Sequence, residues 1–222
     1  MSLEQKDPAG RCLLPGSLIG DTRAVALTEF AFALPILLTL TAFSLELANY
    51  VLTMKRVGDL AVMVTDNATR IGVRSKGLSI HQISEAEIND VLIGAQIQAN
   101  LPDFQTNGRV VLSSLQRNTD GGQWIAWQRC YGDLDFVSAY GPEGTGAEGT
   151  SFEGVGPSTQ PIQAPDGNSV MVTEISYRYE PIFPITGARE RTISEFAAFS
   201  TRENRDLSAP RNTEGVTVAE CD

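Results

Sequence analysis

One long apolar stretch, residues 25–52, constrains this chain more than any other feature, and it carries a carboxylate near each end. Glu29 stands at its start and Glu46 near its end, while no charged side chain lies between Phe30 and Leu45. A helix needs about 20 apolar residues to cross a bilayer, and this stretch provides them if Glu46 lies near an interface. We therefore expect residues 25–52 to be the transmembrane half of a long helix. A carboxylate at bilayer depth costs about 2.5–3.5 kcal/mol, so Glu29 indicates a role beyond plain anchoring.

The residues before this stretch, 1–24, are mostly polar and contain several Pro and Gly, which is typical of a leader rather than of a folded element. The apolar run is longer than the core of roughly 7–15 residues in a secretory signal peptide, and no A-x-A-like cleavage site follows it. Basic residues lie on both sides of the run, so the positive-inside rule gives no clear orientation. We place the leader in the cytoplasm because the longer, cysteine-bearing part, residues 53–222, lies on the other side.

The remainder of the chain has the pattern of an α+β domain. Apolar residues recur at steps of three and four as far as Val73, so the N-terminal helix is expected to span about 25–73. Ser84 and Glu87 form a capping box that begins a second helix, which ends at about residue 100. Alternating segments bounded by Gly, Asn and Pro predict an antiparallel sheet with strands at 109–116, 124–130, 170–179 and 191–200. We thus expect a pilin-like arrangement of a long N-terminal helix, a C-terminal antiparallel sheet and one additional helix.

One segment, 131–168, is rich in Gly and Pro and predicts a long loop inside this domain. Loops of this length in compact domains are usually functional or disordered. We consider it a candidate contact for a partner subunit.

The composition argues against several classes of function. A net charge of -10 repels phosphate, so no nucleic-acid partner is expected. His81 is the only histidine in the chain, so metal sites built from several histidines are excluded. A Ser-His-Asp triad would depend on His81 alone, and this residue has the character of a surface or cap position. No glycine-rich phosphate loop is present, and the acidic residues do not pair as in glycosidases. We expect neither an enzyme nor a cofactor.

The three cysteines, Cys12, Cys130 and Cys221, show neither metal spacing nor a C-x-x-C motif. If the part after the apolar stretch is exported, Cys130 and Cys221 share an oxidising compartment and Cys12 does not. A disulfide between Cys130 and Cys221 then follows as a hypothesis. Two buried free thiols are the alternative.

Glu29 has two interpretations. It is either an interfacial residue at a helix start, stabilised there by about 0.3–1 kcal/mol through the helix dipole, or part of an assembly contact. In the second case, a cut after Ala24 leaves a positive amine on Val25, with Glu29 one turn further along. Glu29 then pairs with the amine of a neighbouring subunit, because each charge buried alone costs several kcal/mol. Such a pair fixes the register between subunits.

These residues carry a family resemblance. A short leader followed by an apolar helix, with Glu29 fifth after the cut and aromatic Phe30 next, resembles the class III prepilin signal. More closely, residues 23–50 resemble the TadE-like family of tight-adherence (Tad/Flp) pilus proteins, which are related to type IV pili. The matching features are Arg23, the Glu29-Phe30 pair, Leu34-Pro35 with the following aliphatic run, and Leu45-Glu46. Later segments, 125–132, 176–181 and 202–207, are similar to alphaproteobacterial members.

The resemblance implies a minor pilin or pseudopilin that acts in pilus biogenesis without catalysis. It implies a single-pass protein of the bacterial inner membrane with a cytoplasmic N-terminus and a periplasmic domain. Incorporation in the pilus is a further implication. The implied partners are other pilin and pseudopilin subunits, a prepilin peptidase, the Tad inner-membrane platform and the lipid bilayer. The family usually has Gly before the cut, where this chain has Ala24, so the leader is either removed at Ala24-Val25 or retained by an anchored assembly factor. A membrane-anchored binding or scaffold domain that does not polymerise, and a tethered enzyme, are the alternatives.

Overall fold

The computed structural model describes residues 22–74, 81–183, 189–201 and 206–221. Most of the expected leader, residues 1–21, and part of the 202–207 segment lie outside the described residues. The elements are α1 (Thr22–Ala68), β1 (Val73–Arg74), β2 (His81–Gln82), α2 (Glu85–Ala99), α3 (Phe104–Asn107), β3 (Gly108–Arg117), β4 (Gln123–Tyr131), β5 (Val170–Tyr179) and β6 (Arg191–Ser200).

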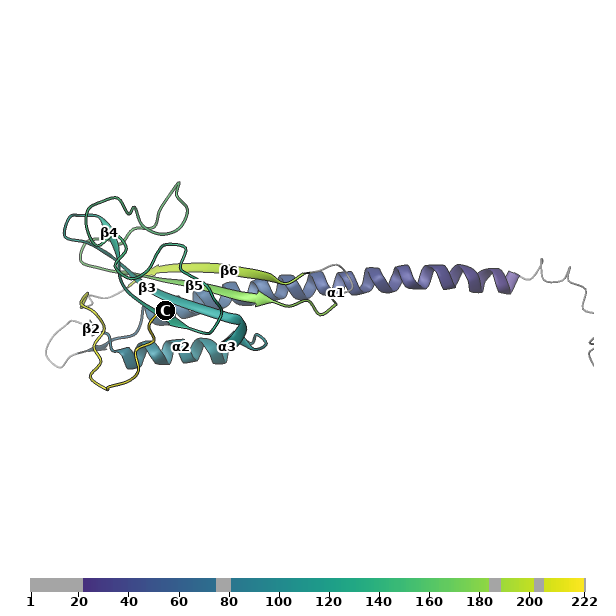
Figure 1. Ribbon diagram of the computed structural model, residues 1–222, viewed down its shortest axis with the longest axis horizontal. Helices are drawn as coiled ribbons and strands as arrows, with labels where there is room; N and C mark the ends of the chain where they lie inside the picture. Colours follow the sequence, from purple (N-terminus) through teal and green to yellow (C-terminus); the bar gives the residue numbers. More distant parts are fainter. Residues whose placement is uncertain (1–21, 75–80, 184–188, 202–205, 222) are drawn as a thin grey trace, which may run out of the picture.

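The N-terminal helix α1 is continuous over 47 residues, about 70 Å at 1.5 Å per residue. Its first half projects from the domain as a rod, and its second half lies along the sheet (Figure 1). The helix ends at Ala68, earlier than the 25–73 pattern predicts. The Thr69 hydroxyl donates to the carbonyl of Asp66 and the Arg70 amide to that of Asn67, which closes the last turn tightly. Gly72, at a φ of 130°, then takes the chain out of the helical direction.

The four long strands form one antiparallel sheet in the order β4-β3-β5-β6. The predicted bounds of β5 and β6 agree with the structure, and β3 and β4 are each slightly longer than predicted. The β3–β4 hairpin turns over Asn118, whose side-chain oxygen accepts the amides of Asp120 and Gly122 at 3.0 and 2.8 Å. Such an Asx-type turn explains why the sequence around Asp120 breaks the strand pattern.

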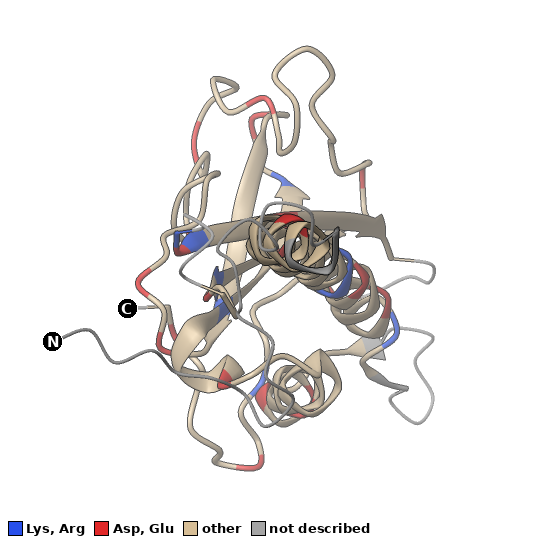
Figure 2. Cartoon of the chain, turned by 90° about the vertical axis from the view of Figure 1, so that its right-hand side faces the viewer, with Lys and Arg blue, Asp and Glu red and all other residues tan. Residues whose placement is uncertain are grey.

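Both long helices cover the same face of the sheet, as the view along α1 shows (Figure 2). The second half of α1 packs on β5 and β6, and α2 packs against α1. The core between them contains Val57, Leu60, Val64, Ile88, Leu92, Leu112, Trp127, Met171 and Ile175. The alternation predicted for β5 is confirmed, since its odd-numbered apolar residues lie in this core while Val170 and Val172 face the other side. Trp127 is buried, whereas Trp124 is only half-buried.

The second helix starts as predicted. Ser84 accepts the amide of Glu87 at 3.2 Å, and the Glu87 carboxylate accepts the amide of Ser84 at 3.1 Å, which completes the capping box. Asn100 ends the helix in the left-handed conformation, at a φ of 46°. The resulting architecture is pilin-like α+β: a long apolar N-terminal helix on a four-stranded antiparallel sheet, with a shorter helix beside it.

The Gly- and Pro-rich segment folds back over the face of the sheet that the helices leave open. Val155 and Ala164 are buried there together with Leu115, Val170 and Val172. The segment needs only a few apolar residues to cover this face, because the strands supply most of the side chains in this second, smaller core.

Candidate functional site: the projecting helix and its junction with the sheet

The first half of α1 presents apolar side chains in every direction. From residue 25 to residue 45, every side chain is exposed except the half-buried Ala42. By length and composition, α1 could cross a membrane within Val25–Ala68. A helix that is apolar on all sides needs lipid or other helices around it, since it has no polar face for water.

The residues expected at the processing and register sites all lie at the beginning of this projecting half. The Ala24-Val25 bond is in the first turn of α1. Glu29 and Phe30 are both exposed, one turn further along. Within the described part of the chain, Glu29 is the only charged side chain between Val25 and Leu45. The structure places these residues together on one helix and leaves their processing and pairing as predictions.

The sequence analysis placed Glu46 only near a membrane interface, whereas the structure gives its carboxylate partners at the end of β5. Its side chain is buried, at 5% exposure, where α1 first meets the sheet. The Tyr179 hydroxyl donates to one carboxylate oxygen, and the backbone amide of Phe183 donates to the other at 2.9 Å. Asn49, almost one turn along, donates its side-chain amide to the Tyr179 hydroxyl at 2.9 Å. Glu46 is therefore the centre of a buried polar junction between the helix and the end of β5.

The surroundings of the Tyr179 ring and hydroxyl favour its hydrogen bond to Glu46. Its ring lies edge-on to that of Tyr50, with centroids 5.2 Å apart. Burial of the hydroxyl, together with its hydrogen bond to Glu46, raises the pKa of Tyr179 to about 12. The hydroxyl thus keeps its proton at neutral pH and remains a donor to the carboxylate. No local sequence signal identifies this contact, because Glu46 and Tyr179 are 133 positions apart.

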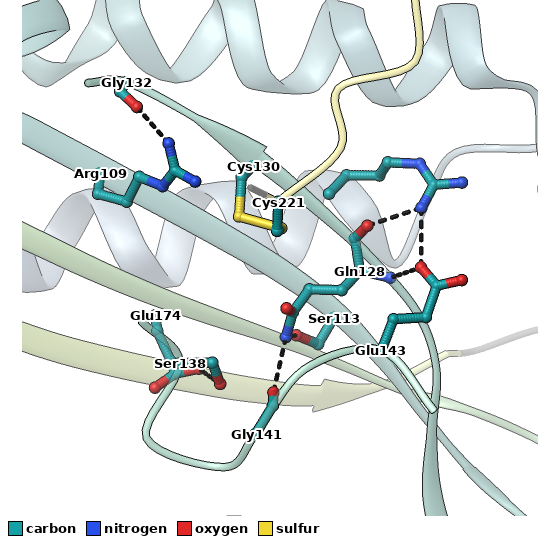
Figure 3. Close-up of a disulfide and its surroundings, with 11 residues drawn as sticks. Arg109, Ser113, Gln128, Cys130, Gly132, Ser138, Gly141, Glu143, Glu174 and Cys221 are labelled. Carbon is teal, nitrogen blue, oxygen red and sulfur yellow. Dashed lines mark hydrogen bonds and ion pairs between the residues drawn. A yellow bond between two sulfur atoms is a disulfide. The ribbon is translucent and has the colours of Figure 1, made fainter. Parts of the chain in front are cut away.

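The predicted disulfide between Cys130 and Cys221 is present (Figure 3). It attaches the C-terminal segment 206–221 to β4, which is an edge strand of the sheet. The Cys130 amide also donates to the carbonyl of Ala219 at 2.8 Å, and the Arg211 amide donates to that of Ile83 at 2.9 Å. The segment thereby covers part of the β4 edge and the start of α2.

A buried ion pair lies next to the disulfide. Arg129 on β4 donates to the carboxylate of Glu85, the first residue of α2, at 2.5 to 3.1 Å. Glu143, which is half-exposed, accepts from the same guanidinium at 3.1 Å. Burial of Arg129 opposes its charge, but the bonds and the field of Glu85 outweigh burial, so the pKa of Arg129 is raised. This pair, which the sequence did not indicate, connects α2, β4 and the loop.

The same region anchors the long loop to the sheet (Figure 3). The Gln128 amide donates to Glu143 at 2.9 Å, and the Gln128 side chain donates to the Gly141 carbonyl at 3.2 Å. On β5, the Glu174 carboxylate accepts from the Ser138 hydroxyl and, at 2.9 Å, from the Ala139 amide. The first part of the loop is thus held by polar contacts, and a partner contact there remains a prediction.

An open cleft of about 520 Å³ lies between the β3–β4 turn and the loop. Arg117 at its rim pairs with Asp166 at 2.6 Å, and Gln123 exchanges hydrogen bonds with the backbone of Ala164. These side chains already have partners within the protein. Among the residues that the structure describes, no group of three or more His, Cys, Asp or Glu side chains could hold a metal ion.

Neither the family models, nor the curated proteins, nor the solved structures give a match to this chain.

Proposed function

We propose that this chain is a minor pilin or pseudopilin of the TadE-like family that acts in the biogenesis of the Tad (Flp) pilus and has no catalytic role. The observation that carries the proposal is the division of α1. Its second half is built into the folded domain, while its first half offers apolar side chains on all sides and one carboxylate, Glu29.

The length of the projecting half agrees with insertion in a bilayer. Residues 25–45 span about 32 Å at 1.5 Å per residue, and the hydrocarbon core of a bilayer is about 30 Å thick. Insertion in a bacterial inner membrane, with the N-terminus in the cytoplasm, leaves the domain in the periplasm. The Cys130–Cys221 disulfide favours that side of the membrane, since disulfides persist in oxidising compartments.

Glu29 supplies the assembly function. After removal of the leader, the amine of Val25 on one subunit pairs with Glu29 of the next, and the two charges neutralise each other inside a bundle of apolar helices. The partners are accordingly other pilin and pseudopilin subunits, the prepilin peptidase that releases Val25, the Tad platform and the bilayer.

Mass spectrometry of the N-terminus of the protein purified from membranes tests this function. A chain that begins at Val25 supports processing by a prepilin peptidase. A chain that retains its leader would contradict the pairing through the Val25 amine. The presence of Ala24 at the position usually held by Gly favours one second candidate, an anchored scaffold that keeps its leader and does not polymerise.

A further inference from the structure

The end of the domain nearest the projecting half of α1 includes residues 180–183, which follow β5. The Phe183 amide reaches Glu46 on α1, and the end of β5 is directed toward the projecting half of the helix (Figure 1). By comparison, the end of α2 meets α1 at Arg56, whose guanidinium donates to the Asn100 carbonyl at 3.5 Å. Arg56 is ten positions beyond Glu46, about 15 Å further along the helix axis. Ile182 and Phe183 are therefore closer to the projecting half than α2 is.

Ile182 is apolar and 58% exposed at this end of the domain. Single exposed apolar residues are common on soluble proteins and need no explanation by themselves. Ile182 differs in its position, because it adjoins Glu46, the first side chain along α1 that is buried against the domain. Leu45 and Leu47 on the helix, on either side of Glu46, are exposed to a similar degree.

A positively charged residue lies at the same height along α1 as Glu46. Arg191 is exposed and lies opposite Tyr179 in the register of β5 and β6, next to the Glu46 junction. Arginine side chains at the ends of membrane segments place their charge among lipid headgroups while their stems contact apolar groups. Apolar Ile182 and charged Arg191 together have the chemistry of an interfacial contact.

We propose that residues 180–183, directly after β5, are a second membrane-contacting element, in which Ile182 and Phe183 enter the interfacial layer of the bilayer that α1 crosses. The inference rests on the proposed insertion of residues 25–45, which puts Glu46 at the outer boundary of the hydrocarbon. The bonds from Glu46 to Tyr179 and Phe183 hold this element against the helix. Two contacts with the membrane, one through α1 and one through Ile182, fix the tilt of the domain.

The test uses the full-length chain with Cys12→Ser, which leaves the disulfide as the remaining cysteine pair. Ile182→Cys, Val62→Cys and Phe32→Cys are each labelled with an environment-sensitive fluorophore in vesicles of phosphatidylcholine and phosphatidylglycerol. Spin-labelled lipids then quench any fluorophore in contact with the bilayer. Val62 is the matched control, since it is apolar, 50% exposed and about 24 Å beyond Glu46 on the same helix.

The fluorophore at position 182 is expected to lose most of its emission, as is that at position 32, while position 62 keeps its emission. Equal emission at 182 and 62, with quenching at 32, would overturn the second contact and leave the insertion of α1 intact. Emission that persists at position 32 would overturn both, because the helix itself would then lie outside the bilayer.

Discussion

The contribution of the Cys130–Cys221 disulfide to the free energy of unfolding can be calculated from its position in the chain. The disulfide closes a loop between residues 91 positions apart, from the edge strand β4 to nearly the last residue of the chain. In the chain-entropy model, a loop of 91 residues lowers the entropy of the unfolded chain by about 15 cal/mol/K, or about 4.6 kcal/mol at 25 °C. Domains of this size are stabilised by about 5–15 kcal/mol in total, so Cys221→Ser is expected to remove a large fraction of the stability.

Tryptophan fluorescence during urea unfolding in mild detergent measures this loss. Both tryptophans, Trp124 and Trp127, lie on β4 close to Cys130, so their emission reports on the sheet rather than on α1. With a urea dependence of about 2 kcal/mol/M, the midpoint of Cys221→Ser should fall by about 2 M. The unmodified protein under reducing conditions should unfold like this variant.

Cys12→Ser is the control, because Cys12 belongs to the expected leader and is not bonded to Cys130 or Cys221. Its midpoint should equal that of the unmodified protein. The reasoning fails if Cys221→Ser also unfolds at the unmodified midpoint, since the C-terminal segment would then not constrain the fold.

Three further predictions concern the folded domain. Glu85→Gln leaves Arg129 buried without its main counter-charge and should lower the free energy of unfolding by about 3 kcal/mol in urea. Glu143→Gln removes only the half-exposed partner and should lower it by under about 1 kcal/mol. Equal losses would contradict the assignment of the buried pair. Burial raises the pKa of Glu174, and its hydrogen bonds offset part of this rise. The contribution of Glu174 to stability is therefore present at acidic pH and is lost as the pH rises through the raised pKa. Glu174→Gln should raise the melting temperature at pH 7 but not at acidic pH, and a uniform effect would argue against this linkage. Gly94→Ala places a methyl group in open space on α2 and should stabilise the domain by about 1 kcal/mol in thermal unfolding, unless that face of the helix is covered.

Local patterns in the sequence account for much of this fold. The period-two alternation of β5, with apolar residues facing α1, specified the strand together with the face that it buries. The capping box at Ser84 specified where α2 starts, because both of its hydrogen bonds connect residues three positions apart. Such features are predictable since the interacting groups are neighbours along the chain.

Two of the features that sequence reasoning missed depend on contacts between distant residues. The partners of Glu46 could not be predicted, because Tyr179 and Phe183 come close to it only once β5 has paired and α1 has packed on the sheet. The Arg129–Glu85 pair likewise joins residues 44 positions apart. The cover over the second face of the sheet was missed for a different reason, because its few apolar residues bury themselves against strands and have no periodicity of their own.

Assembly through Glu29 is the central proposal, and the incorporation of a Glu29→Ala variant into sheared surface pili tests it most directly. Thr39→Ala is the matched control, since Thr39 is also exposed on the projecting half and its hydroxyl donates only to carbonyls of its own helix, those of Pro35 and Ile36. We predict that the Thr39 variant supports piliation at the unmodified level, while the Glu29 variant reaches the membrane in normal amounts and is lost from the pilus fraction, with piliation reduced. Unchanged piliation and incorporation of the Glu29 variant would contradict the account.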